Sequence, residues 1–583
     1  MLSTTEIRIL DLLPREPNEN EQARIRCQTR VLPISSDLDY ETVSYVWGDR
    51  SNTSLIEVDG NNVAITNNLE AALRRIRLSE TRTLWVDQIC INQEDDEEKA
   101  NQIPLMRQLY SNTKQCLIWF GELRSDIQLS DAKAALDVIH FLNDNDEDSP
   151  VDISVSYSSI SEQTLPNTMK AFGSIALQEN SWWHRIWTLQ EAILPSKACV
   201  LWGPLSISWE VVLRAGQNWV SQPAPQMLWP YIDVVNGLFS QTNGLLFSKR
   251  RHEQPLHTAY RWGFRRATNP LDKVYGVLGL FPSGTLPRSE CCNYQLQPAS
   301  VLAMFTADLI EHSRSLHPMA LRNLSGLPES TPNIPSWAYD FAVSVNQNKL
   351  TVDGDSAAWY LINVYYTYRA CGNMEVDWKS FRFDPDFNSL TLSGFMVDET
   401  AVIGTKPQGD SPDTINVSIQ SAINYINDWY RTAEEFYQGR EYPQDFTSPE
   451  NWSDSFWRAL LGDLILDSEF ASERDARQED ITLAKEFVRT GQRNEVCYSI
   501  FGNMCYRTMF ITKTGLLGFG ANHMSVGDQV WVLDGGNVPF ILRPSSGNPV
   551  PDSHYLIGPS YVHGIMENEA ATETHKSKSI CLI

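Results

Sequence analysis

Several common signals are missing from this sequence. Its ten cysteines include no Cys-x-x-Cys pair and no His/Cys cluster with zinc-finger spacing, so we expect reduced thiols and no metal site. The apolar runs all fall short of the ~20 residues that span a bilayer. The N-terminal segment MLSTTEIRILDLLPREP is amphipathic and partly acidic, unlike a secretory signal. These absences predict a cytoplasmic protein.

Positive charge is also scarce. Lys and Arg total 47 against 72 Asp and Glu, which gives a formal net charge of −25. A phosphate backbone or an anionic membrane would be repelled, so we expect neither nucleic acid nor membrane as a partner. Hydrophobic residues make up 42% of the chain and include 18 Trp, so most of it should fold. A length of 583 residues predicts two or three domains.

Strand and helix patterns alternate over the first 205 residues, which favours an α/β unit with a largely parallel sheet. Asp59-Gly60-Asn61 supplies the turn of a hairpin between two alternating strands. A helix should follow, with Asn67 or Asn68 as its N-cap. Further strands are expected at 6–14, 41–49, 81–93, 114–122 and 196–203, and helices at 94–113 and 181–194.

The rest of the chain changes character twice. Residues 124–170 are interpreted as an insertion, with a helix over 131–144 and a Ser-rich part expected to be mobile. We therefore predict a domain over 1–205, a mainly helical region over 206–345, and a β-rich α+β region over 346–583 with a helical insert at about 415–495. Asp534-Gly535-Gly536 predicts a second hairpin in the last region.

Three blocks resemble one known family. They are SYVWGD at 44–49, the long block from Leu84 to Glu122, and RIWTLQEAILPSKACVLWG at 185–203. Their order, spacing and residues resemble the HET (heterokaryon incompatibility) domain of filamentous fungi. Segments around 265–280, 334–341 and the end of the chain resemble the usual C-terminal companion region of such proteins. The resemblance covers most of the chain.

The resemblance implies a role in self/non-self recognition and programmed cell death, a form of fungal innate immunity. HET domains are distantly similar to Toll/interleukin receptor (TIR) domains, which implies a flavodoxin-like, mostly parallel sheet. In TIR enzymes that cleave NAD, a helix carries a Trp four residues before the catalytic Glu. Trp187 and Glu191 have that spacing here. The resemblance thus implies Glu191 as catalytic residue and NAD as substrate, with no bound cofactor.

The chemistry of these two residue types agrees with that role. Positions i and i+4 share a helix face, and an aromatic ring beside a carboxylate suits a flat, cationic nicotinamide. A carboxylate also stabilises the oxocarbenium-like centre that forms when the glycosidic C–N bond breaks. The alternative is structural, with Trp187 in the core and Glu191 on the helix surface or capping an N–H group.

Substrate-binding candidates follow from strand ends, because ligands collect at the carboxyl edge of doubly wound sheets. For Asp49 and Asn92, capping or turn chemistry is at least as good an explanation. Asp87 lies in an apolar run and needs a partner, which Arg185 could be. Cys90 has no His in its motif to activate it as a nucleophile. The substrate-binding candidates are Trp47, Asp49, Asp87, Cys90, Asn92, Arg185 and Trp187.

Two functional classes remain open. In the first, the N-terminal domain hydrolyses NAD or a related nucleotide once assembly completes its pocket. In the second, it is a non-catalytic assembly module whose partners are other incompatibility proteins or further copies of itself. A third reading is a HET protein without any role in fusion incompatibility. His563, in SYVHGIM near the C-terminus, is interpreted as a satisfied strand histidine.

Overall fold

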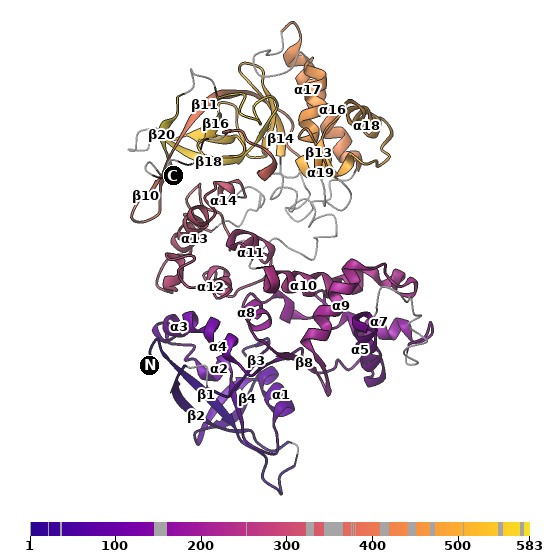
Figure 1. The fold of residues 1–583 in the computed structure, drawn as a ribbon, viewed down its shortest axis with the longest axis vertical. Coiled ribbons are helices and arrows are strands. Elements are labelled where there is room, and N and C mark those ends of the chain that lie inside the picture. The colour runs from indigo at the N-terminus through magenta and orange to yellow at the C-terminus, as the bar shows by residue number, and fades with distance from the viewer. Residues whose placement is uncertain are drawn as a thin grey trace. The chain divides into compact units, whose positions relative to one another are not determined.

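A computed structural model shows two compact units, Met1–Leu296 and Gln297–Ile583 (Figure 1). Each unit is described by itself. The structure describes residues 2–20, 22–34, 38–144, 160–251, 253–321, 331–342, 365–372, 374, 376, 378, 381–407, 419–440, 451–466, 473–504, 507–545, 552–571 and 576–583.

A nine-stranded sheet, ordered β5-β4-β2-β1-β6-β3-β7-β8-β9, forms the centre of the N-terminal unit. Its strands are β1 (Glu6–Leu12), β2 (Arg26–Pro33), β3 (Glu41–Ser44), β4 (Thr53–Val58), β5 (Asn61–Thr66), β6 (Arg82–Trp85), β7 (Gln115–Trp119), β8 (Ala198–Trp202) and β9 (Leu205–Ser208). The four strands β6, β3, β7 and β8 pair in parallel. The β1–β2, β1–β6, β4–β5 and β8–β9 pairs are antiparallel. The sheet is therefore mixed rather than mostly parallel, because hairpins extend the parallel centre.

The parallel centre has a topological switch point at β3. In chain order its strands run 2-1-3-4, and a flavodoxin-like fold stays a prediction. β6 pairs with one edge of β3 and β7 pairs with the other edge. In such sheets, ligands bind beyond the carboxyl ends of the strands at this point. Likeness to a TIR domain in particular stays a prediction.

Local sequence explains the first hairpin and the helix after it. Asp59 and Gly60 both have positive φ, 52° and 76°, as a two-residue turn between twisted strands requires. The N-cap of α1 (Asn67–Ile76) is Thr66, whose side chain accepts from Leu69 N, so the predicted caps Asn67 and Asn68 were wrong. Asn68 instead donates to the carbonyl of Val46 and accepts from Trp119 Nε1 at 3.0 Å.

The segment predicted as one strand over 81–93 is a strand followed by a helical turn. β6 ends at Trp85, and α2 (Asp87–Cys90) begins where Asp87 Oδ1 accepts from Gln88 N at 2.8 Å. The expected helix over 94–113 is present as α3 (Asp96–Gln102), η1 (Ile103–Leu105) and α4 (Met106–Asn112). Asp95 caps α3 by accepting from Glu97 N and Glu98 N.

Helices complete the N-terminal unit. They are α5 (Leu129–Asp144), α7 (Leu165–Gly173), η2 (Ser181–His184), α8 (Thr188–Ile193), α9 (Trp209–Ser221), η3 (Gln226–Tyr231), α10 (Ile232–Arg251), α11 (Pro255–Arg261), α12 (Asp272–Leu278) and η4 (Ser289–Cys291). The expected helix over 181–194 is thus divided into η2 and α8. Helices α5, α7, α9 and α10 pack together, so the helix of the predicted insertion joins helices beyond residue 205. The predicted boundaries at 205 and 345 do not coincide with the division at 296. The Ser-rich part, residues 145–159, lies outside the described residues.

The C-terminal unit combines a large sheet with helices, as its sequence pattern indicates. Its helices are α13 (Pro298–Ser313), α14 (His317–Ala320), α16 (Ile419–Tyr437), α17 (Trp452–Leu461), α18 (Gln478–Thr490) and α19 (Cys497–Met504). Its strands are β10 (Arg382–Phe383), β11 (Leu390–Ile403), β12 (Leu464–Leu466), β13 (Glu473–Asp475), β14 (Arg507–Thr512), β15 (Leu517–Ala521), β16 (Gln529–Leu533), β17 (Phe540–Pro544), β18 (Ser553–Pro559), β19 (Tyr561–Val562) and β20 (Lys578–Leu582).

One long strand organises this second sheet. β11 pairs antiparallel with β14, β16 and β20, and its register shifts within the pairings to β14 and β16. Such irregularities bend a strand, which allows β11 to pair with different strands along different parts of its length. The hairpin expected at Asp534-Gly535-Gly536 is present between β16 and β17, with Gly535 at φ 82°.

The described parts of the chain lack membrane-spanning helices, metal-binding clusters and disulfides. No helix there is long and apolar enough to cross a membrane. No group of three or more His, Cys, Asp or Glu side chains in these ranges is placed to hold a metal ion. The nine cysteines within them are free thiols.

Candidate functional site

Glu191 lies in α8, which packs against β3 and β7 at the switch point. Its side chain is buried, since only 4% of the residue is exposed. Ser44, the last residue of β3, donates its hydroxyl to Glu191 Oε2 at 2.5 Å. Trp182 Nε1 in turn donates to Ser44 Oγ at 2.8 Å. A chain of two hydrogen bonds therefore holds the carboxyl group at the carboxyl end of the central strand.

Burial changes the acidity of this group. It raises the pKa of Glu191 to about 7, and the charge of Asp87 acts in the same direction. Arg185, the Ser44 hydrogen bond and Arg265 oppose the shift. Both protonation states of Glu191 are therefore populated near neutral pH, as suits a group that exchanges protons or charge with a substrate.

A second group of side chains surrounds Asp87. Trp47 Nε1 donates to Asp87 Oδ2 at 2.7 Å, and Arg185 Nη2 donates to the same oxygen at 3.1 Å. Arg185 Nη1 also donates to the carbonyl of Tyr45 at 3.0 Å, and its guanidinium lies 5.5 Å from the Trp47 ring centre. Arg185 is thus the partner that the sequence suggested for Asp87. These hydrogen bonds connect the η2–α8 segment to the loops that follow β3 and β6.

Trp187 precedes Glu191 by one helical turn, and its carbonyl accepts from Glu191 N at 3.5 Å. It is the N-cap of α8 and is half-buried. Its side chain forms a hydrogen bond with Asp272 in α12, a carboxyl whose pKa is raised by burial. Tyr294 donates to the same carboxylate at 2.6 Å. Trp182 is connected to Glu191 through Ser44, a link that the sequence did not predict.

Three further candidates lie apart from this group or are closed off. Asp49 is exposed and accepts from the backbone N and hydroxyl of Ser51, which lowers the pKa of Asp49. Asn92 Oδ1 accepts from Glu94 N at 3.2 Å in a turn. Turn chemistry therefore explains both residues. Cys90 is fully buried, and burial raises the pKa of its thiol to about 12, which excludes a ready nucleophile.

Comparison with known proteins identifies the family. Residues 40–191 match the model of the HET family, "Heterokaryon incompatibility protein (HET)", and residues 467–583 match that of the "Het-6 beta-barrel domain". The chain is also 24% identical, over 677 aligned positions, to "Heterokaryon incompatibility protein 6, OR allele" of Neurospora crassa. That alignment covers 97% of this chain and 95% of the relative. The chain is a fungal HET-domain protein. It belongs to a family of self/non-self recognition, and no solved structure matches it.

The HET match contains Ser44, Asp87 and Arg185 and ends at Glu191. Arg265 lies outside it and was not predicted from the sequence. Its guanidinium is fully buried, donates to Thr188 Oγ1 at 2.6 Å, and lies 4.8 Å from the Trp262 ring centre and 6.0 Å from that of Trp182. Burial lowers the pKa of Arg265 to about 9, and the charge of Glu191 opposes this shift.

Arg265 is incompletely paired, because its Nε and Nη2 are buried without a hydrogen-bond partner. An arginine with free donors beside a buried acid stabilises the charged form of that acid. The pKa of Glu191 therefore depends partly on Arg265, which lies in the helical region after the HET match. Ser44 and Trp182, which lie within or next to the quoted motifs, were also not predicted, since apolar strands and paired tryptophans suggest core packing.

Proposed function

We propose that the HET domain hydrolyses the N-glycosidic bond of NAD or a related nucleotide, and that this reaction carries the recognition signal to programmed cell death. The observation that supports the proposal most is Glu191 itself. It is a buried carboxyl group with a pKa of about 7, held by Ser44 at the topological switch point of the sheet. Such a position and such a shift are typical of functional carboxyl groups.

In the proposed reaction the C–N bond to nicotinamide breaks, and nicotinamide leaves as a neutral molecule with the bonding electron pair. The charged form of Glu191 stabilises the oxocarbenium-like ribose. Water adds to the anomeric carbon and releases one proton to solvent. Arg185 offers a positive charge to the diphosphate, and Trp47 offers a ring whose centre lies 4.5 Å from the Arg50 guanidinium and 5.5 Å from that of Arg185.

Access is the step that assembly would control. Because Glu191 is 4% exposed, substrate reaches it only after α8 and the loop beyond β3 separate. Association of several chains would supply the free energy for that opening, in keeping with partners that are other incompatibility proteins or further copies of this chain. The protein at low concentration should therefore be nearly inactive.

The test is release of nicotinamide from NAD by the purified full chain, with and without clustering by a fused dimerisation tag. We expect activity to rise on clustering and Glu191→Gln to lower it by at least about 100-fold. Glu210→Gln is the matched control, since the Glu210 side chain is 79% exposed. Inactive wild type when clustered, or full turnover by Glu191→Gln, refutes the proposal.

The closed arrangement around Glu191 favours a second candidate, a non-catalytic assembly module. In that case the Ser44–Glu191 and Asp87–Arg185 contacts would simply hold α8 on the sheet. A Glu191→Gln protein that folds and still triggers cell death when expressed in hyphae would support this candidate, whereas a folded but silent variant supports the enzyme.

A further inference from the structure

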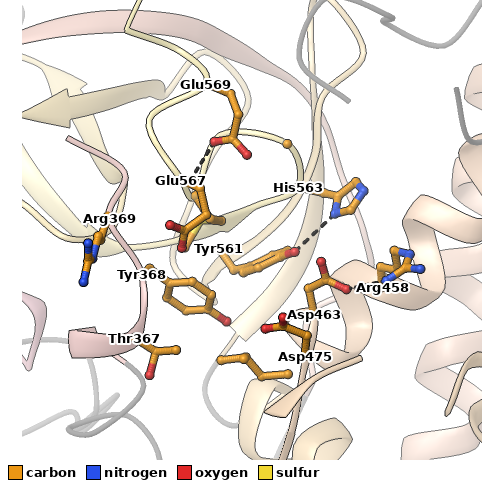
Figure 2. A pocket seen from close by; sticks show the side chains of 13 residues that line it. Thr367, Tyr368, Arg369, Arg458, Asp463, Asp475, Tyr561, His563, Glu567 and Glu569 are labelled. Carbon is orange, nitrogen blue, oxygen red and sulfur yellow. Dashed lines mark hydrogen bonds and ion pairs between the residues drawn. The ribbon is translucent and has the colours of Figure 1, made fainter. Parts of the chain in front are cut away.

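A cavity of about 790 Å³ lies in the C-terminal unit, and His563 is among the residues that line it (Figure 2). Three segments line it: the chain at 367–369, the region from α17 to β13, and the turn that follows β19. A volume of this size is typical of pockets that take a small molecule or a few side chains.

The charges that line the cavity are unbalanced. Four carboxyl groups and two guanidinium groups face it. One guanidinium is already engaged, since Arg458 Nη1 lies 2.8 Å from Asp463 Oδ1 and also donates to the carbonyl of Ala476 at 3.0 Å. Arg369 is then the remaining cation for Asp475, Glu567 and Glu569.

These carboxylates affect one another. Burial raises the pKa of Glu567, and the negative charges of Glu569 and Asp475 add to that effect, while Arg369 opposes it. Glu569 Oε2 accepts from the backbone N of Glu567 at 2.6 Å, which holds the Glu569 carboxylate beside the Glu567 backbone. A cation entering the cavity would reduce this repulsion.

Aromatic faces lie among the acids. The rings of Tyr368 and Tyr561 have centres 5.7 Å apart, and in the view of Figure 2 the Tyr561 ring lies between Glu567 and Asp463. Tyr561 Oη lies 3.2 Å from His563 Nδ1. Burial lowers the pKa of His563, so the imidazole adds no positive charge near neutral pH.

We propose that this cavity binds an organic cation, an ammonium or guanidinium group, between the carboxylates of Asp475 and Glu567 and the two tyrosine rings. Carboxylates provide charge-assisted hydrogen bonds to such a group, and ring faces attract it through their quadrupoles. The cation is carried either by a free amine or by a Lys or Arg side chain of another protein. The cavity extends into the region matched by the Het-6 barrel family, so it would give that domain a ligand-sensing role independent of Glu191.

The test uses the full chain and isothermal titration calorimetry at low salt with three probes. Agmatine represents a free amine, acetyl-Gly-Arg-Gly-amide represents a basic side chain, and acetyl-Gly-Glu-Gly-amide is the anionic control. We expect agmatine, the arginine peptide or both to bind, with affinity that falls as salt is added, and the glutamate peptide not to bind. Binding of agmatine alone identifies a small amine, and binding of the peptide alone identifies a protein side chain.

Variants decide whether binding occurs in this cavity. Asp475 and Glu567 are both exposed residues, so Asp475→Asn and Glu567→Gln should keep the fold. We expect each substitution to lower the affinity for the cationic probe by about tenfold, and we expect Glu567→Lys to abolish binding. Glu486→Gln is the matched control, on α18 and outside the cavity lining. Failure of both cationic probes to bind the wild type, or unchanged affinity in Glu567→Lys, overturns the proposal.

Discussion

Ser44 and Glu191 stand 147 residues apart in the chain, yet Ser44 Oγ donates to Glu191 Oε2 at 2.5 Å. The first residue ends the central strand β3, and the second lies in α8 after four further strands. Ser44 also accepts from Trp182 Nε1, so one hydroxyl orients both an indole and a carboxyl group. The contact therefore joins the central strand to a helix that comes much later in the chain.

Replacing Ser44 by Ala should raise the pKa of Glu191 further, because the Ser44 hydroxyl bonds to its charged form and lowers that pKa. It also leaves Trp182 Nε1 buried without its acceptor, at a cost of about 1–3 kcal/mol. The pKa is measured by NMR titration of ¹³C-labelled Glu side chains. Ser44→Thr, which keeps the hydroxyl, is the control, and an unchanged Glu191 titration in Ser44→Ala would contradict the expected coupling.

The stability of the N-terminal unit should depend on pH through Glu191. Its pKa is about 7 in the folded protein, against the ordinary 4.5, so the proton favours the folded state. The stabilising contribution is complete below about pH 4.5 and is lost as pH rises through about 7, by about 3 kcal/mol. Glu191→Gln should remove this pH dependence. The free energy of unfolding of the variant should therefore rise relative to that of the wild type between pH 5 and pH 8.

Urea unfolding at several pH values, followed by tryptophan fluorescence, measures that difference. Glu210→Gln again serves as control, because an exposed carboxyl group should leave the wild-type slope intact. Parallel pH profiles for the wild type and Glu191→Gln would show that Glu191 is already charged in the folded protein at pH 5.

Short-range patterns predicted the elements better than the site. Asp59-Gly60 predicted its hairpin because turn conformation is a local property. The helical turn at Asp87–Cys90 was not predicted, since four residues carry too little periodicity to distinguish it from the strand that precedes it. The sequence did suggest Arg185 as the partner of Asp87. The reason was that a carboxylate in an apolar run needs a partner, and no geometric pattern was involved.

Arg265 shows why the rest of the site could not be predicted. It stands 77 residues from Thr188, to which it donates, and no local pattern marks an arginine as buried. Trp187 has helical backbone dihedrals and its carbonyl accepts from Glu191 N at 3.5 Å, so the i, i+4 spacing holds, while its side chain bonds to Asp272, a partner 85 residues away that no local pattern indicates.

Arg265→Met tests the electrostatic role of this arginine. Met keeps much of the buried volume but leaves the Glu191 carboxylate without this neighbouring cation, so the protein should be destabilised by about 1–3 kcal/mol. The pKa of Glu191 should rise, because the Arg265 charge lowers it. The NMR titration used for Ser44→Ala measures this shift, and Arg185→Met, which also breaks the ion pair with Asp87, gives the comparison. No rise in Arg265→Met would show that Arg265 has only a packing role.

Two cysteines of the N-terminal unit should differ in the rate at which their thiols are alkylated. Cys90 is fully buried with a pKa of about 12, whereas Cys291 is exposed. Because the thiolate is the reactive form, iodoacetamide at pH 8 should label Cys291 within minutes and leave Cys90 unmodified until the chain unfolds. Peptide mapping by mass spectrometry, with and without urea, measures both sites. Rapid labelling of Cys90 in the folded protein would mean that the turn Asp87–Cys90 opens readily, and would reinstate Cys90 as a group that substrate can reach.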